Sequence, residues 1–328
     1  MRFSDLLQFY GARITAHLPN RVLRWLSGEP PLEADGVRFD AHAQFLRNVR
    51  RKRHRFGLVQ PDVEAGRRRY RHETSAFRGR VTEVGDVCNL TVDGLRMRHY
   101  TPPAASRDLL VYLHGGGFAI GDLDTHDEPC RILCRHANTH LLSVDYRLAP
   151  EHKFPAALED AAHAFAFAQS LGVERISIGG DSAGANLATV TARGAFAQLL
   201  VYPVTDSLTH RRSYDLFGEG HFLTMIDREE FRLLYTEGTG FTGSDPRISP
   251  LHGDLTDHPP ALVVTAGFDL LRDEGEAYAE ALERAGNVVR TLRVPTLGHG
   301  FIHLTGISRT ARKAMLRIAA EWRTLLDR

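Results

Sequence analysis

The chain has 328 residues, of which 43% are hydrophobic and 25% charged, a composition typical of globular proteins large enough to bury a substantial core. Its formal net charge is +1, so no overall field selects nucleic acid or an acidic partner. No apolar run approaches the roughly 20 residues that cross a bilayer, and the N-terminus shows no signal-peptide pattern. We therefore expect a cytoplasmic protein without stable membrane insertion.

The three cysteines do not form a disulfide framework. Cys130 and Cys134 lie four positions apart on an expected helix, and no further Cys or His stands at a spacing that would complete a metal site. We expect reduced thiols, no metal and no other cofactor.

Residues 1–56 carry apolar side chains at roughly helical spacing and predict an N-terminal helical cap segment. Phe45 and Leu46 lead into an Arg-rich run over 47–55. This run could bind phosphates or a membrane surface, but a solvated helix face is the interpretation we favour.

The spacing of the apolar residues then changes from helical to strand-like, and we expect a catalytic core over 57–204 and 246–328. Val81 to Val84 and Cys88 to Tyr100 predict two antiparallel strands around the turn Asp93-Gly94. Short apolar runs predict further strands at 109–113, 141–144, 196–204, 261–266 and 288–294. Helical patterns cover 155–169, 273–285 and 309–326.

Short apolar strands that alternate with helices predict the α/β class, with a mostly parallel central sheet flanked by helices. Residues 205–245 interrupt this alternation and are rich in aromatic and charged side chains. We interpret them as an inserted lid, or cap insertion.

An apolar alternation at Ile176 and Ile178 leads through Gly180-x-Ser182-x-Gly184 into Ala-rich sequence with helical spacing. Strand, sharp turn and helix are the context in which a nucleophilic serine is presented at the top of a sheet. Glycine is needed on either side because a Cβ there would collide with the strand or the helix.

A serine nucleophile needs a base, and the base needs a group that orients it. The chain has 17 histidines, but His299 stands between two glycines just after the last expected strand. Asp269 follows the strand before it. Asp273 is the rival for the acid, although it more naturally begins the following helix. We predict a triad of Ser182, Asp269 and His299.

His114, Gly115, Gly116, Gly117 and Phe118 follow the expected strand at 109–113. Consecutive glycines allow main-chain N–H groups to approach a ligand, as a developing oxyanion requires. We expect His114 to brace this loop rather than to act as the base.

Seven segments of the sequence, in this order, resemble the hormone-sensitive-lipase-like family of α/β hydrolases, also called bacterial esterase family IV. They are HGGGF, GDLDTHD, DYRLAPEHKFPAALED, GDSAGANLA, DPRISPL, GFDLLRDEGEAYAEAL and GHGF. The resemblance covers about residues 76–328. It implies the α/β-hydrolase fold with a helical cap made of the N-terminal helices and the insertion.

By position, the resemblance implies that the N–H groups of Gly116, Gly117 and Ala183 form the oxyanion hole and that Gly115 supports their loop. It also implies that Ser182 is the nucleophile. The residues and the resemblance together predict a serine carboxylesterase that acts on a small-molecule ester through an acyl-enzyme.

A thioesterase, an amidase or a lactonase would use the same triad, so these activities stay open. A non-catalytic ligand-binding protein of this fold is disfavoured because His299 is present. We expect Phe118, Phe217, Phe222 and Leu270 to line a short pocket that takes short- to medium-chain acyl groups. A homodimer is compatible with the resemblance but has no support in the sequence.

Overall fold

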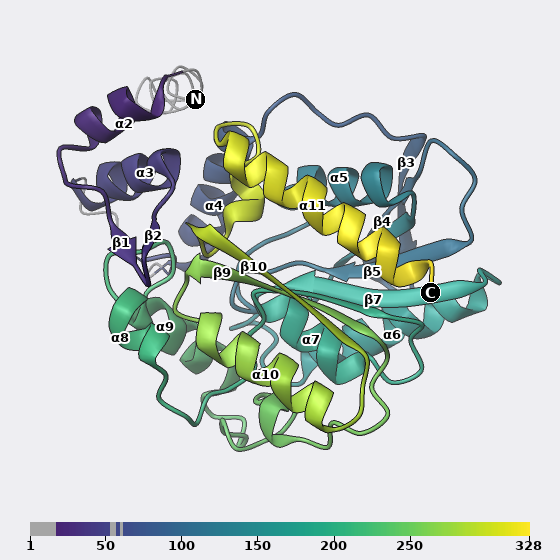
Figure 1. Ribbon diagram of the computed structural model, residues 1–328. Helices are drawn as coiled ribbons and strands as arrows, with labels where there is room; N and C mark the ends of the chain where they lie inside the picture. The colour runs from purple at the N-terminus through teal and green to yellow at the C-terminus, as the bar shows by residue number, and fades with distance from the viewer. Residues whose placement is uncertain (1–17, 53–56, 60–61) are drawn as a thin grey trace.

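The computed structural model of the chain describes residues 18–52, 57–59 and 62–328 (Figure 1). Its centre is an eight-stranded sheet with the order β10-β9-β8-β7-β5-β6-β4-β3. The strands are β3 (Asp86–Val92), β4 (Leu95–Thr101), β5 (Asp108–Leu113), β6 (His140–Asp145), β7 (Arg175–Asp181), β8 (Gln198–Val201), β9 (Ala261–Phe268) and β10 (Val289–Gly298). From β6 to β10 all neighbours are parallel, while β3 and β4 pair antiparallel. The predicted α/β class is confirmed.

Helices cover both faces of the sheet. Figure 1 shows α5 (Asp127–Ala137) and α11 (Arg309–Leu326) on one face. On the other face lie α6 (Ala156–Ser170), α7 (Ala183–Thr191) and α10 (Arg272–Arg284). Every residue of β5 and β9 is buried, so these strands read as continuous apolar runs rather than as alternating patterns. The carboxyl ends of the parallel strands meet at one edge, where sites form in such sheets.

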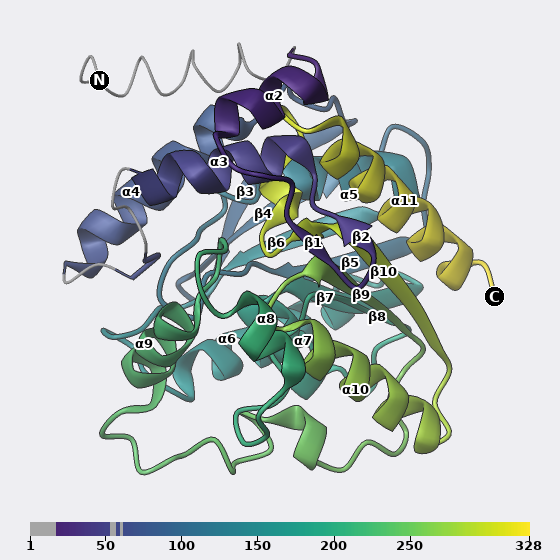
Figure 2. The same ribbon diagram turned by 60° about the vertical axis from the view of Figure 1, so that its left-hand side comes forward.

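Smaller elements gather at that edge. They are α2 (Asn20–Ser27), β1 (Glu33–Ala34), β2 (Val37–Arg38), α3 (Ala41–Lys52), α4 (Val63–Phe77), α8 (Arg212–Phe217) and α9 (Met225–Thr236). Figure 2 shows α3 and α4 on one side of the strand ends and α8 and α9 on the other. The helical pattern expected over residues 1–17 lies outside the described residues.

The expected strand from Val81 to Val84 is wrong, since these residues form no strand. The N–H and the hydroxyl of Thr82 both donate to the carboxylate of Glu128, at 3.0 and 2.6 Å. The segment is therefore bound to α5 instead of to the sheet. The predicted turn at Asp93-Gly94 does join β3 to β4, and both of its residues have positive φ.

The Arg-rich run is only in part the solvated face that we expected: Arg51 is exposed, but two of its neighbours are not. The side chains of Arg47 and Arg50 are only 10% and 18% exposed. Arg47 pairs with Glu29 at 3.3 Å, and Arg50 lies 3.9 Å from Glu73. These arginines pack α3 against its neighbours. Positions 53–56 lie outside the described residues.

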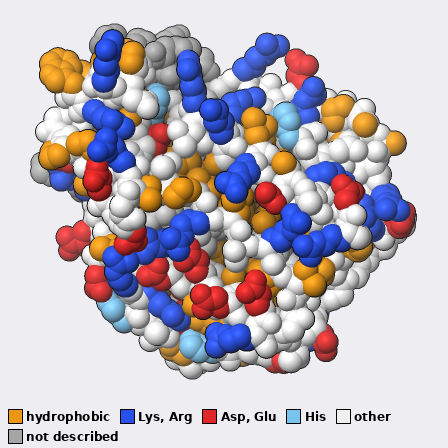
Figure 3. Space-filling model, viewed as in Figure 1, with side chains coloured by type: hydrophobic (Ala, Val, Ile, Leu, Met, Phe, Trp, Pro, Cys, Tyr) orange, Lys and Arg blue, Asp and Glu red, His pale blue; other side chains and the backbone are white. Residues whose placement is uncertain are grey.

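No helix in the described part of the chain is both long and apolar enough to cross a membrane. On the face seen in Figure 3, Lys and Arg side chains are interspersed with Asp and Glu. This mixture agrees with the small net charge.

Helix α9 begins with a capping box that also anchors the N-terminal part of the chain. The N–H of Asp227 donates to Oγ1 of Thr224 at 3.1 Å, and the N–H of Thr224 donates back to the Asp227 carboxylate at 3.0 Å. The other carboxylate oxygen of Asp227 accepts the N–H of Leu58. One side chain thus connects α9 to the segment before α4.

Thr224→Ala removes the hydroxyl that caps α9, and we expect it to lower the free energy of unfolding by about 1 kcal/mol. Thr224→Ser keeps the hydroxyl and is the matched control, which should stay near the wild type. The measurement is urea unfolding followed by far-UV circular dichroism. Equal stability of Thr224→Ala and the wild type would contradict a stabilising cap.

Candidate active site

Ser182 stands in the turn between β7 and α7 with φ 53° and ψ −120°. Non-glycine residues avoid positive φ, and such positions cost on the order of 1–3 kcal/mol. Main-chain hydrogen bonds hold the residue there: its N–H donates to Val201 at 2.8 Å, and its carbonyl accepts from Asn186 at 3.1 Å. The strained backbone expected of a nucleophile elbow is present.

Gly180 and Gly184 allow this turn to pack against β5. A Cβ on either glycine would collide with the main-chain carbonyl of Leu113, and on Gly184 also with that of His114. Because backbone cannot move aside as a flexible side chain can, both positions require glycine. The next loop of the site, after β5, is thereby brought against the elbow.

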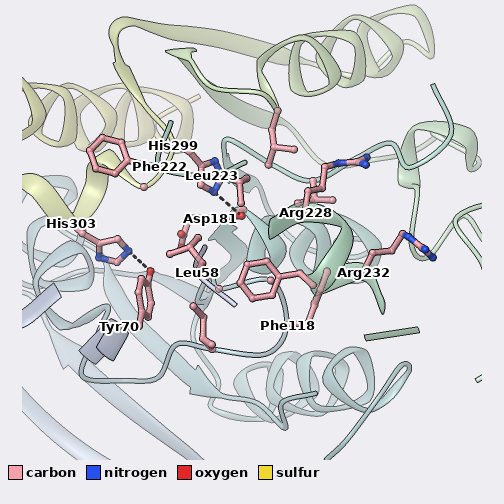
Figure 4. Close-up of a pocket in the computed structure, with 18 of the residues that line it drawn as sticks. Leu58, Tyr70, Phe118, Asp181, Phe222, Leu223, Arg228, Arg232, His299 and His303 are labelled. Atoms are coloured by element: carbon pink, nitrogen blue, oxygen red, sulfur yellow. Dashed lines mark hydrogen bonds between the residues drawn. The ribbon is translucent and has the colours of Figure 1, made fainter. Parts of the chain in front are cut away.

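His299 lies between Ser182 and Asp269 (Figure 4 shows His299 at the cavity). Its Nδ1 is 2.8 Å from Oδ2 of Asp269, and its Nε2 is 3.0 Å from Oγ of Ser182. With the Nδ1 proton donated to the carboxylate, Nε2 is left as an acceptor for the serine hydroxyl. Asp269 is 1% exposed, and its other oxygen accepts the N–H of Leu271 at 3.0 Å.

Asp273, the rival acid, has other partners. Its Oδ1 accepts from Arg272 at 2.8 Å, and its Oδ2 accepts the N–H of Ser213 at 2.8 Å. It belongs to the first turn of α10, where a carboxylate favours the helix dipole. The structure therefore brings Asp269, and not Asp273, to His299.

The glycine loop follows β5 and lies beside Ser182 in the same cavity. Gly116 and Gly117 have φ of 123° and 59°, and the carbonyl of Gly116 accepts the N–H of Ile120 at 2.9 Å. Within the described residues, the N–H groups of Gly116, Gly117 and Ala183 donate to no protein acceptor. These three donors therefore have no acceptor within the described protein.

His114 and Gly115 hold this loop from below. The imidazole of His114 stacks on Tyr146 with 4.3 Å between ring centroids, and the Tyr146 hydroxyl donates to the His114 carbonyl at 2.6 Å. The N–H of Gly115 donates to the carboxylate of Asp181 at 3.0 Å. These contacts agree with a bracing role for both residues.

The glycine loop also packs directly on α9. The ring of Phe118 stacks on that of Tyr235 with centroids 3.9 Å apart. A Cβ on Gly117 would collide with the ring of Phe231. Helix α9 and the loop therefore form one packed unit.

Beside Ser182 lies a cavity of about 130 Å³ (Figure 4). Its lining is largely apolar and aromatic and includes Leu58, Tyr70, Phe118, Phe222, Phe231 and Leu271. Phe118 and Phe222 were expected there, whereas Tyr70 comes from α4, a helix that the sequence did not lead us to expect.

Two expected lining residues are buried elsewhere. Phe217 packs on Phe268, with ring centroids 5.5 Å apart, under the guanidinium of Arg272. Leu270 is 1% exposed, and its carbonyl accepts the hydroxyl of Ser213. Its neighbour Leu271 lines the cavity instead, because the chain turns into α10 at this point.

His126, Asp181 and His303 form a buried cluster whose possible ligand atoms all lie within 4.8 Å of one another, close enough to hold a metal ion. The oxygens of Asp181 already accept hydrogen bonds, and Nε2 of His303 lies 2.8 Å from the hydroxyl of Tyr70 (Figure 4). Burial alone would raise the pKa of Asp181, but the neighbouring His126 holds it well below its usual range. The carboxylate is therefore ionised.

The fold and this site define a serine hydrolase. Residues 110–303 match the alpha/beta hydrolase fold family, and the chain belongs to that family. An alignment of 320 positions, which covers 90% of this chain and 85% of the relative, shows 39% identity to the carboxylic ester hydrolase LipN of Mycobacterium tuberculosis. With the ethyl acetate hydrolase of Pseudomonas putida the chain shares 34% identity over 78% of its length and 88% of that protein.

Among solved structures, an ester-hydrolase from the metagenome of Lake Arreo, in complex with a bipyridine phosphonate derivative, has a TM-score of 0.80 and 36% identity. That match covers 86% of this chain and 97% of the other. The Pyrobaculum calidifontis esterase matches with a TM-score of 0.75 and 34% identity over 85% of this chain and 97% of its own. The resemblance to the hormone-sensitive-lipase-like family is confirmed, and the chain is a carboxylic ester hydrolase.

Three histidines around the site are kept neutral by burial. Burial lowers the pKa of His114 and of His221 to about 4 and that of His303 to about 3. An unfolded chain binds these protons near pH 6.5. Between about pH 6.5 and 4 the unfolded state binds more protons than the folded state. The contribution of these histidines to the free energy of unfolding is therefore full above this window and is lost as the pH falls through it.

We expect the free energy of unfolding to decrease from pH 7 to pH 4.5, and His221→Phe to flatten this slope. His221 packs among Phe39, Phe217 and Phe268, where a phenyl ring fits but binds no proton. Each histidine contributes at most about 1.4 kcal/mol per pH unit. Urea unfolding at a series of pH values measures the slope.

Phe217→Leu is the matched control for this experiment, because it disturbs the same cluster without changing a titratable group. It should lower stability at every pH and leave the slope as it is. A slope in His221→Phe equal to that of the wild type would contradict the assignment of a neutral, half-buried His221.

Proposed function

We propose that this carboxylic ester hydrolase cleaves short- to medium-chain acyl esters through an acyl-enzyme on Ser182. One observation carries the proposal: Asp269, His299 and Ser182 form an unbroken hydrogen-bonded chain of 2.8 and 3.0 Å beside an apolar cavity. A catalytic chain that ends in a pocket of this kind is the arrangement that acyl transfer requires.

In the proposed reaction, His299 accepts the proton of Ser182 while Oγ attacks the ester carbonyl carbon. The carbonyl oxygen becomes an oxyanion that accepts hydrogen bonds from the N–H groups of Gly116, Gly117 and Ala183. The intermediate collapses, and the alcohol leaves with the proton from His299. Water then attacks the acyl-enzyme, gives a proton to His299, and the carboxylic acid leaves as the Ser182 hydroxyl is restored.

The size and lining of the cavity support short acyl groups. A volume of about 130 Å³ is below the range of about 300–1,000 Å³ usual for drug-sized ligands. Rigid aromatic walls such as Phe118 and Phe231 leave little room for a long chain. We propose a small-molecule ester as the substrate.

For the domains we propose the organisation expected from the sequence. Residues 1–56 and 205–245 form the cap, and residues 57–204 and 246–328 form the catalytic core. The homodimer that the resemblance allows stays a prediction. The free thiols of Cys88, Cys130 and Cys134 are what a reducing compartment preserves, which supports the proposed cytoplasmic location.

Ser182→Ala removes the nucleophile and should lower kcat by at least about 1,000-fold. Ser177→Ala is the matched control, a buried serine on the same strand β7, and should keep wild-type turnover. The measurement is hydrolysis of a chromogenic butyrate ester. A thioester, an amide and a lactone with a similar acyl group, assayed in parallel, separate esterase activity from its alternatives. If Ser182→Ala kept a substantial fraction of wild-type kcat, the nucleophile would lie elsewhere.

A series of esters from acetyl to palmitoyl tests the size of the pocket. We expect kcat/KM to rise up to butyryl or hexanoyl, since each buried CH₂ contributes about 0.8 kcal/mol. It should fall steeply by dodecanoyl, because overfilling a packed site costs about 1–3 kcal/mol. An optimum at palmitoyl would contradict the proposed short pocket.

Phe222→Leu enlarges the cavity, so the variant should hydrolyse larger esters than the wild type does. A series of acyl groups and a series of alcohol groups both measure this range. Phe217→Leu is its control, because Phe217 is buried away from the cavity. Equal broadening by both variants would mean a general loosening of the cap and not a change of the lining.

A further inference from the structure

Asp181, one residue before Ser182, is 2% exposed and lies at the wall of the cavity (Figure 4). Its Oδ1 accepts the Tyr112 hydroxyl at 2.9 Å and the N–H of Gly115 at 3.0 Å. Its Oδ2 accepts the Tyr202 hydroxyl at 3.4 Å. The proposed mechanism uses none of these groups directly.

A buried carboxylate is costly unless polar groups surround it, and the imidazole of His126 is one of its neighbours. Its Nε2 lies 3.3 Å from Oδ1 of Asp181, and the side chain is fully buried. Its Nδ1 lies 2.9 Å from the hydroxyl of Thr125, which fixes the orientation of the ring. The imidazole of His126 thus faces the carboxylate of Asp181.

Two partners of Asp181 reach the catalytic groups. The first is Gly115, which directly precedes the N–H donors of Gly116 and Gly117. A Cβ on Gly115 would collide with the carboxyl group of Asp181, so the loop lies against this side chain without a gap. A shift of the carboxylate would move the oxyanion donors.

The second partner is Tyr202, whose ring packs on the imidazole of His299 with centroids 4.5 Å apart. Tyr202 has a positive φ of 37°, and its N–H donates to Val264 at 2.6 Å. Its hydroxyl points to Asp181, and its ring face supports the base. The same carboxylate is thus connected to the oxyanion loop and to His299.

We propose that Asp181 is a positioning residue that sets the oxyanion donors and the base His299 at their correct distance from Ser182. This inference rests on the ester hydrolysis proposed above. Displacement of reacting groups by about 1 Å can cost on the order of 100-fold in rate. A carboxylate bound to both arms of the site prevents such displacement.

The test is Asp181→Asn, which keeps the size of the side chain but removes its charge. We expect kcat to fall at least about tenfold because charge-assisted hydrogen bonds are roughly twice as strong as neutral ones and the loop loses its anchor. KM should change little, since Asp181 binds no part of the substrate in the proposed mechanism. The inhibition constant of a short-chain trifluoromethyl ketone, whose adduct places an oxyanion in the hole, should rise in parallel with the loss of kcat/KM.

Asp108→Asn is the matched control. Asp108 is also 2% exposed and ion-paired, with Arg175 and Arg323, but it lies at the opposite end of β5 from the glycine loop. It should lower the melting temperature and leave kcat unchanged. An equal loss of kcat in both variants, or a loss in Asp181→Asn confined to KM, would overturn the positioning role.

Ser182→Ala, assayed beside these variants, separates the two proposals. Wild-type kcat in Asp181→Asn together with an inactive Ser182→Ala overturns the role of Asp181 and leaves the proposed function in place. An active Ser182→Ala overturns the proposed function itself. The metal content of the purified wild type completes the test, because a stoichiometric ion held by His126, Asp181 and His303 would bind the carboxylate and overturn this account of the cluster.

Discussion

The left-handed backbone of Ser182 is the constraint on which the site depends. A residue in this conformation relaxes unless its surroundings hold it, and here β5, β7, β8 and α7 all take part. Hydrogen bonds to Val201 and from Asn186 fix the main chain, and the glycines on either side allow β5 to approach without a gap. The result is a hydroxyl whose position is set by the sheet and not by a flexible loop.

The parallel sheet also brings together residues that are far apart in the sequence. His299 is 117 positions from Ser182 in the sequence, and Asp269 is also far from it. Yet each of them lies at a strand end on the same edge of the sheet. The strand order β7-β8-β9-β10 places Ser182, Asp269 and His299 one after the other across that edge. The glycine loop after β5 lies on the other side of β7. Each group therefore needs only a short loop, and short loops are easily held in one geometry.

The sequence allowed the fold class and the arrangement at Ser182 to be predicted because both depend on local patterns. Apolar strand runs mark the sheet, and glycines mark the turns that need them. The lining of the cavity was predicted only in part, since Phe217 and Phe222 occupy similar sequence surroundings and differ only in how α8 and the following loop pack. Leu270 and Leu271 are neighbours in one turn, and only Leu271 lines the cavity. The connections of Asp181 join residues from four strands or loops, and no spacing along the chain reveals them.

The packing of α9 on the glycine loop affects how new substrate specificities can arise in this protein. Because Phe231 and Tyr235 rest on Gly117 and Phe118, a change in α9 that alters the shape of the cavity also disturbs the machinery beneath it. A second wall of the cavity is the loop around Phe222, whose ring lies under the guanidinium of Arg50 of α3. Natural variation and directed evolution should therefore accumulate on this second wall, where diversity and turnover do not compete.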